Sequence, residues 1–231
     1  MLEIFLNIMV ALFGIVITPF MAGLVQLFCD EKKVTLKNIN SHRKFVPTMA
    51  IITPILLLAL FYHFGATLQF VVYTFLTIIL IMDAFADMKA QIIPNGLNFI
   101  CFLVGAVYIY FTTIQDSVAG VDLLLGMLTG GGIFGLIAVF AYVMYKKEGM
   151  GMGDVKLMAV LGMFFGVYNT IQIFVLSFAI GAVMSIILMV AKLKKSSDYM
   201  AFGPFIVIAS ILTMFIPYTV MFPWYLNLIG G

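Results

Sequence analysis

Long apolar runs separated by short polar segments dominate the chain. Most of these runs are long enough to cross a hydrocarbon layer of about 30 Å as an α-helix. None alternates residue by residue in segments of about ten, as the strands of a membrane β-barrel do. The pattern predicts an all-α, polytopic membrane protein with about eight transmembrane helices. The apolar stretches cover roughly residues 4–28, 45–63, 68–87, 97–115, 122–145, 154–168, 171–191 and 204–227.

Two connections between these stretches are very short. Only residues 64–67 separate the second stretch from the third, and Tyr168-Asn169-Thr170 separates the sixth from the seventh. Connections of this length join antiparallel neighbours, so we expect a tight turn at each place.

Composition supports the membrane assignment. Of the 231 residues, 64% are hydrophobic and 10% are charged, whereas soluble domains carry about 25% charged residues. The net charge of +2 gives no sign of a nucleic-acid surface. Cys29 and Cys101 cannot form a multi-bridge scaffold or a four-thiolate zinc site. Because Met1-Leu2-Glu3 contains no basic residue, we expect the first stretch to be a permanent helix rather than a cleaved signal.

The basic residues are confined to alternate connections. All twelve lysines and arginines follow the first, third, fifth or seventh stretch, and neither terminus contains one. Cytoplasmic loops of membrane proteins are enriched in such residues. We therefore expect a multi-pass protein of the cytoplasmic membrane with both termini outside and four connections in the cytoplasm.

Three aspartates lie at or near the ends of apolar stretches. Asp83 and Asp87 end the third, and Asp154 begins the short sixth. A carboxylate at membrane depth is costly, which makes it a functional candidate, although an aspartate at a helix end often simply faces interfacial water. The expected topology brings Asp87 and Asp154 to the same leaflet. Two carboxylates that meet inside a bundle share one proton, so that one acts as a base toward water and the other as an acid.

Alternating glycines precede the last of these carboxylates. Gly149, Gly151 and Gly153 lead directly to Asp154. A backbone without side-chain walls allows another extended backbone to approach closely. A hinge or tight turn would use the same residues, but the second carboxylate at matching depth favours a catalytic role.

These segments resemble the type IV prepilin peptidases, membrane aspartic proteases with a Gly-x-Gly-Asp motif. Gly151-Met152-Gly153-Asp154-Val155-Lys156-Leu157 is similar to the extended second motif of that family. Asp87 stands seven residues before the Pro94-Asn95 pair, as in the first motif. Phe202-Gly203-Pro204-Phe205 is similar to the C-terminal signature. The motifs occur in the family order, and the resemblance covers nearly the whole chain.

The resemblance implies an enzyme that removes the short basic leader of type IV prepilins or pseudopilins at the cytoplasmic membrane face. Asp87 and Asp154 match the catalytic aspartates, while Asp83, one helical turn before Asp87, is the rival for the first role. The expected partners are the prepilin substrate and membrane lipid, with no nucleic acid. The motif residues expected to shape the approach of the substrate are Gly151, Gly153, Lys156, Pro94, Asn95, Gly203 and Pro204.

One part of the chain departs from the family pattern. Many bacterial members carry a cytosolic domain with paired Cys-x-x-Cys zinc motifs after the first helix and also methylate the new amino terminus. Here residues 29–45 form only a short loop with Cys29 and His42, which cannot complete a tetrahedral zinc site. We expect one integral-membrane peptidase domain over residues 1–231, without metal, cofactor or N-methyltransferase activity.

Other classes of protein remain as alternatives. An ion-coupled transporter also uses intramembrane aspartates and glycine-broken helices, but it needs carboxylates near mid-bilayer or matching halves. Presenilin-like proteases share the Gly-x-Gly-Asp motif, but their Tyr-Asp and Pro-Ala-Leu elements are absent here. A non-enzymatic scaffold explains neither the aspartates nor the glycines. The particular pilin-like substrate and the oligomeric state are left open.

Overall fold

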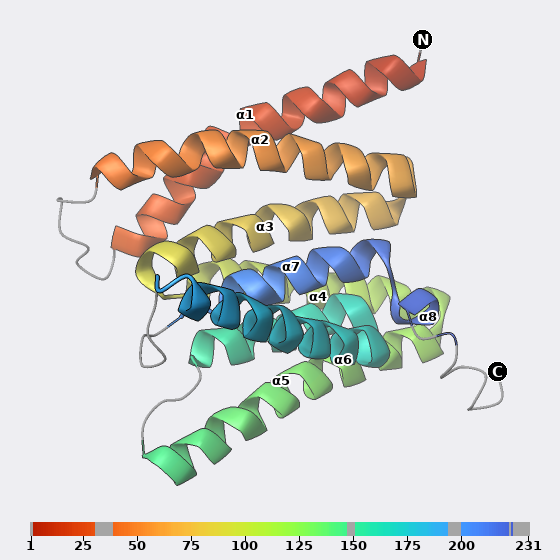
Figure 1. Ribbon diagram of the computed structural model, residues 1–231. Helices are drawn as coiled ribbons and strands as arrows, with labels where there is room; N and C mark the ends of the chain where they lie inside the picture. Colours follow the sequence, from red (N-terminus) through yellow and green to blue (C-terminus); the bar gives the residue numbers. More distant parts are fainter. Residues whose placement is uncertain (1, 31–38, 147–150, 194–199, 222, 224–231) are drawn as a thin grey trace. The chain divides into compact units, whose positions relative to one another are not determined.

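The structure is a computed structural model that describes residues 2–30, 39–146, 151–193, 200–221 and 223. Within these ranges every regular element is an α-helix, so the predicted all-α class is confirmed. The helices, labelled in Figure 1, are α1 (Leu2–Asp30), α2 (Ile39–Phe64), α3 (Leu68–Ala90), α4 (Asn95–Gln115), α5 (Ser117–Tyr145), α6 (Met152–Val190), α7 (Gly203–Phe215) and α8 (Tyr218–Met221).

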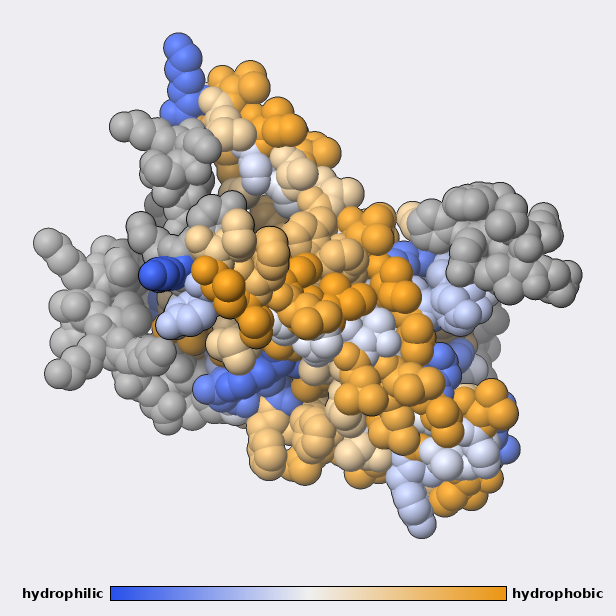
Figure 2. Space-filling view, turned by 90° about the horizontal axis from the view of Figure 1, so that it is seen from below, coloured by the Kyte–Doolittle hydropathy of each residue, from blue (hydrophilic) through white to orange (hydrophobic). Residues whose placement is uncertain are grey.

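Six of these helices, α1 to α6, are long and apolar enough to cross a membrane. They also present large apolar side chains outward: Val118 is 80% exposed, Leu136 72% and Val190 78%. Figure 2 shows a face of the molecule on which hydrophobic residues, in orange, cover much of the described surface. A soluble monomer rarely exposes so much apolar surface, whereas a lipid bilayer covers it. The polytopic membrane class is confirmed, while the count of eight spans and the side of each terminus stay predictions.

The chain forms two compact units, Met1–Pro94 and Asn95–Gly231. In the first, α1, α2 and α3 contact one another, and Figure 1 shows them side by side. Gly65, with φ 62°, and the Thr67 cap make the short turn between α2 and α3 that the sequence predicts. The Thr67 hydroxyl accepts a hydrogen bond from the Phe70 amide at 3.3 Å, which satisfies one free amide of the new helix. The single-domain expectation for residues 1–231 stays a prediction.

In the second unit, α5 packs along both parts of α6. A Cβ atom at Gly126 would overlap the carbonyl oxygen of Gly162, and one at Gly130 would overlap that of Met158. The same added Cβ atom at Gly130 would lie 3.1 Å from Cγ2 of Thr170. From Gly126 to Gly130 along α5, the facing residue in the first part of α6 therefore changes from Gly162 back to Met158, so these two segments run antiparallel. Over the same stretch of α5, the facing residue in the second part of α6 changes from Gly166 forward to Thr170, so these two segments run parallel. The two parts of α6 consequently run antiparallel.

The chain reverses inside α6 at Gly166. This glycine has φ 72° and ψ −178°, a region essentially reserved for glycine. The carboxylate of Asp122 on α5 occupies the place that a Cβ atom would take, and its Oδ1 accepts a hydrogen bond from the Val167 amide at 3.3 Å. The expected turn at Tyr168-Asn169-Thr170 is wrong, because those residues are helical and the break comes earlier. Asp122 caps the second part of α6, where a negative charge is favourable.

Candidate active site

Asp83 and Asp87 lie in the last two turns of α3. Half of the apolar window of α3 is buried, compared with 17–28% in the other long helices, so these carboxylates sit on a helix with few lipid-exposed positions. Asp83 is fully buried and Asp87 is 6% exposed. Their four-residue separation places both side chains on one face. Neither carboxyl oxygen of Asp83 has a hydrogen-bond partner among the described residues.

The helix that carries Asp87 ends three residues after it, at Ala90. The amide of Gln91 donates a hydrogen bond to the Asp87 carbonyl at 2.8 Å, and Gln91 adopts the left-handed conformation with φ 52°. A residue in this conformation is a common helix terminator. Three non-helical residues follow, of which Pro94 is buried, and α4 begins at Asn95. The first predicted motif is therefore the end of one helix, a short connection and the start of the next.

Asp154 lies in the first turn of α6. Gly151 is extended, with φ −68° and ψ 133°, and helix begins at Met152. The amide of Asp154 donates to the Gly151 carbonyl at 3.0 Å. Gly153 is already helical; Gly149 lies outside the described residues. Asp154 is 6% exposed, and the positive end of the helix dipole stabilises negative charge there.

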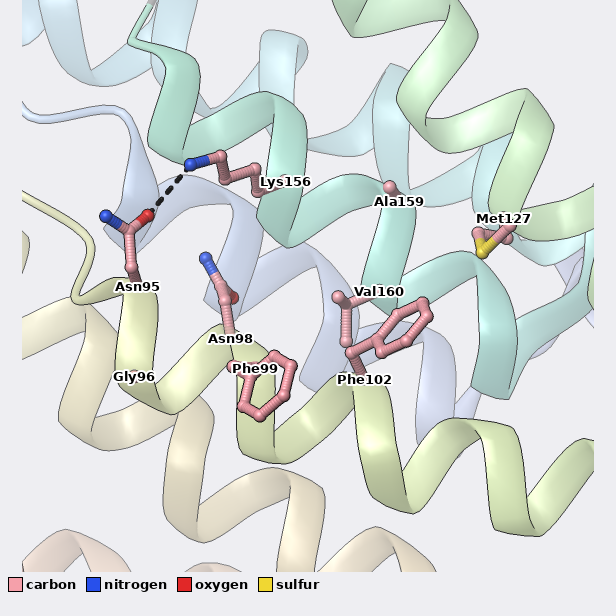
Figure 3. A pocket seen from close by; sticks show the side chains of 9 residues that line it. All are labelled: Asn95, Gly96, Asn98, Phe99, Phe102, Met127, Lys156, Ala159 and Val160. Carbon is pink, nitrogen blue, oxygen red and sulfur yellow. Dashed lines mark hydrogen bonds between the residues drawn. The ribbon is translucent and has the colours of Figure 1, made fainter.

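A hydrogen bond connects residues of the first two motifs. The ammonium of Lys156 donates to Oδ1 of Asn95 at 2.9 Å, joining the first turns of α6 and α4 (Figure 3). Asp87 belongs to the first compact unit and Asp154 to the second.

A pocket of about 630 Å³ lies beside the Lys156–Asn95 pair, between α4, α5 and α6. It includes Asn98, a buried residue that the sequence reasoning missed. Its amide nitrogen and oxygen are both buried without a hydrogen-bond partner in the described part of the chain. The sequence does indicate this residue, because Asn98 is a polar residue in an otherwise apolar stretch, three residues after Asn95. The pocket is lined by Asn95, Gly96, Asn98, Phe99, Phe102, Met127, Lys156, Ala159 and Val160.

The third motif packs into an aromatic cluster. The Phe202 ring lies 5.0 Å from that of Phe178 on α6 and 6.2 Å from that of Phe134 on α5, measured between centroids. A Cβ atom at Gly181 would come within 3.2 Å of the Phe205 ring. Pro204 stands in the first turn of α7, where its missing amide costs nothing. These contacts anchor the start of α7, and the role of Gly203 and Pro204 in the approach of the substrate stays a prediction.

No group of three or more His, Cys, Asp or Glu side chains able to hold a metal ion occurs in the described ranges. The side chains of Cys29 and His42, on which the expectation about zinc rests, lie outside the described residues.

A polytopic helical membrane protein with aspartates at its helix ends is the class that these observations define. A model of the Type IV leader peptidase family matches residues 71–186, a segment that contains Asp83, Asp87 and Asp154. The match covers half of the chain, and the protein therefore belongs to the Type IV leader peptidase family. This membership favours a peptidase over the ion-coupled transporter considered above.

Curated relatives carry a matching description. The chain is 28% identical over 172 residues to a "Prepilin leader peptidase/N-methyltransferase" of Legionella pneumophila, covering 73% of this chain and 58% of the relative. Proteins with the same name from Pseudomonas aeruginosa (28% identity; 72% and 56% covered) and Neisseria gonorrhoeae (30%; 56% and 43%) also match. The chain thus spans about half the length of the relatives it matches. No solved structure matches it significantly.

Proposed function

We propose that this protein is a membrane aspartic endopeptidase that removes the leader peptide from type IV prepilins or pseudopilins. One observation carries the proposal. The segment that matches the Type IV leader peptidase family contains buried carboxylates at the end of α3 and at the start of α6, in the sequence contexts of the two family motifs. Burying a carboxylate in a membrane helix is energetically costly, and a catalytic role in peptide hydrolysis explains why this family would keep such residues.

Asp87 and Asp154 are the proposed catalytic pair. One carboxylate, ionised, takes a proton from a water molecule as the water oxygen attacks the scissile carbonyl carbon. The other, protonated, donates its proton to the carbonyl oxygen. When the tetrahedral intermediate collapses, the carbon–nitrogen bond breaks and the amine leaves with a proton from the pair. No covalent enzyme intermediate forms.

The contacts around Lys156 support this pairing. Asp87 precedes Asn95 by eight residues, and Asp154 precedes Lys156 by two. The hydrogen bond between Lys156 and Asn95 brings the neighbouring segments of both motifs together.

We place the cleavage at the cytoplasmic face of the cell membrane. The support is that all twelve basic residues lie in or near alternate connections, one of which follows α3 and another of which precedes α6. A substrate with an apolar segment in the bilayer would present its leader at this face. Lysines near the site, such as Lys89 and Lys156, also suit contact with anionic lipid headgroups.

The proposal covers the peptidase activity alone. The relatives' name also includes an N-methyltransferase. The short 29–45 segment, with Cys29 as its one cysteine, is the reason to expect no methylation from this chain. Mass spectrometry of the cleaved product tests this point, because methylation would add the mass of one methyl group to its new amino terminus.

Co-expression with candidate prepilins tests the proposed function. The wild-type protein should shorten at least one prepilin on a gel, and Asp87→Asn and Asp154→Asn should each abolish the shortening while accumulating normally in the membrane. Full activity of either variant would remove that aspartate from the catalytic pair. Cation- or proton-coupled flux into vesicles without any cleavage would instead favour a transporter.

A further inference from the structure

The pocket between α4, α5 and α6 changes character along its length. Figure 3 shows Asn95, Lys156 and Asn98 at one end and Phe102, Val160 and Met127 toward the other. The polar end is formed by the first turns of α4 and α6, the two helices that begin with the Asn95 motif and the Asp154 motif. A ligand that fills it would therefore lie beside Asn95 and Lys156, which belong to the first and second motifs.

The volume limits what the pocket can hold. A helix with side chains is a cylinder about 10 Å wide that rises 1.5 Å per residue, which corresponds to about 120 Å³ per residue. The open pocket of about 630 Å³ therefore covers about five residues of a bound chain at a time. It suits a short piece of chain.

Asn98 restricts the chemistry of that ligand. Its side-chain amide offers donors on the nitrogen and acceptor sites on the oxygen. It is 5% exposed, and both atoms lack a partner among the residues described. A buried polar group left in this state costs about 1–3 kcal/mol. The acyl chain of a lipid offers neither a donor nor an acceptor, whereas the peptide group of an extended chain offers both.

We propose that this pocket binds a short, apolar, extended stretch of the substrate next to the scissile bond, with the Asn98 amide pairing with one of its peptide groups. This inference rests on the proposed peptidase function. The rings of Phe99 and Phe102, together with Met127 and Val160, receive the apolar side chains of that stretch. Because the Asn98 amide is covered in the structure, binding turns this side chain toward the ligand. Asn98 is thus a residue that positions the substrate.

Kinetics with a purified prepilin measures the contribution of Asn98. Asn98→Leu keeps the size of the side chain but removes both hydrogen-bonding groups, and should raise KM about tenfold with kcat within a factor of two. Thr112→Val on the same helix is the matched control, because the Thr112 hydroxyl bonds only within α4, to the Tyr108 carbonyl at 2.9 Å, among the bonds described. It should leave both constants unchanged. A purely structural Asn98 would yield an unchanged KM and a protein at least as heat-stable as the wild type.

Photo-crosslinking tests occupancy directly and does not depend on Asn98. The photoreactive residue p-benzoylphenylalanine replaces Phe102 in the Asp154→Asn protein, and Phe111, an exposed residue of α4 outside the pocket lining, is replaced as the control. We expect illumination to attach the prepilin at position 102 and not at position 111. Crosslinks to lipid alone at position 102, or equal prepilin crosslinking at both positions, would overturn the pocket assignment.

The outcomes separate the two proposals. If the wild-type protein cleaves no prepilin, the proposed function fails and the pocket assignment fails with it. If the wild type cleaves but Asn98→Leu keeps a normal KM and position 102 attaches no prepilin, only the pocket assignment fails.

Discussion

The ammonium of Lys156 donates a hydrogen bond to the side-chain oxygen of Asn95 at 2.9 Å, across 61 positions of sequence. This bond joins two exposed side chains and links the first turn of α6 to the first turn of α4. Lys156 follows Asp154 by two residues, and Asn95 ends the segment that begins at Asp87. We interpret the pair as a contact that orients the starts of α4 and α6 within the second unit.

The first prediction concerns this connection. Lys156→Met should lower kcat/KM for prepilin cleavage about tenfold, because one charge-assisted hydrogen bond that orients the two motifs is lost. Asn95→Asp should retain most of the activity, since a carboxylate accepts the same bond. Lys146→Met, which changes a lysine at the end of α5, is the control and should cleave normally. Wild-type kcat/KM in Lys156→Met would show that the pair has no positioning role.

The second prediction separates Asp83 from Asp87. Asp83 is fully buried and its oxygens lack hydrogen-bond partners in the described chain, so Asp83→Leu should raise the free energy of unfolding by about 1–2 kcal/mol. Thermal unfolding in detergent measures this change. Asp83→Leu should also keep prepilin cleavage, whereas Asp87→Leu should lose it. If a folded Asp83→Leu protein were inactive while Asp87→Asn still cleaved the prepilin, the first catalytic role would pass to Asp83.

The third prediction concerns the reversal in α6. Gly166→Ala should destabilise the protein by about 2–4 kcal/mol, because a Cβ atom there is strained by the backbone conformation and overlaps the Asp122 carboxylate. Gly132→Ala on α5 is the matched control. Its added methyl meets no atom within 4 Å, so the substitution should be neutral or stabilising by about 0.5–1 kcal/mol. Equal melting temperatures for the two variants would contradict the proposed constraint.

The fourth prediction tests the aromatic cluster at the start of α7. Phe205 is 9% exposed and its ring lies 6.0 Å from that of Phe202. Phe205→Ala should cost about 3 kcal/mol of stability through the cavity that it leaves. Ile208→Ala, at a 45% exposed position of the same helix, should have a much smaller effect. A similar loss in both variants, measured by unfolding in detergent, would mean that the Phe-Gly-Pro-Phe segment does not anchor α7.

Predictions from the sequence were reliable for features that depend only on residues close together in the chain. Most helices were predicted near their observed positions because a membrane helix satisfies its backbone hydrogen bonds within its own segment, so apolar length alone indicates it. The last expected stretch, 204–227, is instead interrupted after α7 ends at Phe215, and the short α8 follows. The turn near Gly65 was predicted because only residues 64–67 separate two apolar stretches. The second turn was placed at residues 168–170 instead of Gly166, because the position of that break depends on Asp122, which lies on another helix.

The sequence by itself determined the membrane class, the helices and the family, since apolar run length and short motifs are properties of contiguous residues. Only the tertiary structure decided which distant residues meet. The Lys156–Asn95 bond and the pocket with its buried Asn98 are formed by helices that are separate in the chain. Contacts of this kind depend on how helix faces pack against one another, and residue spacing within one helix does not specify that packing.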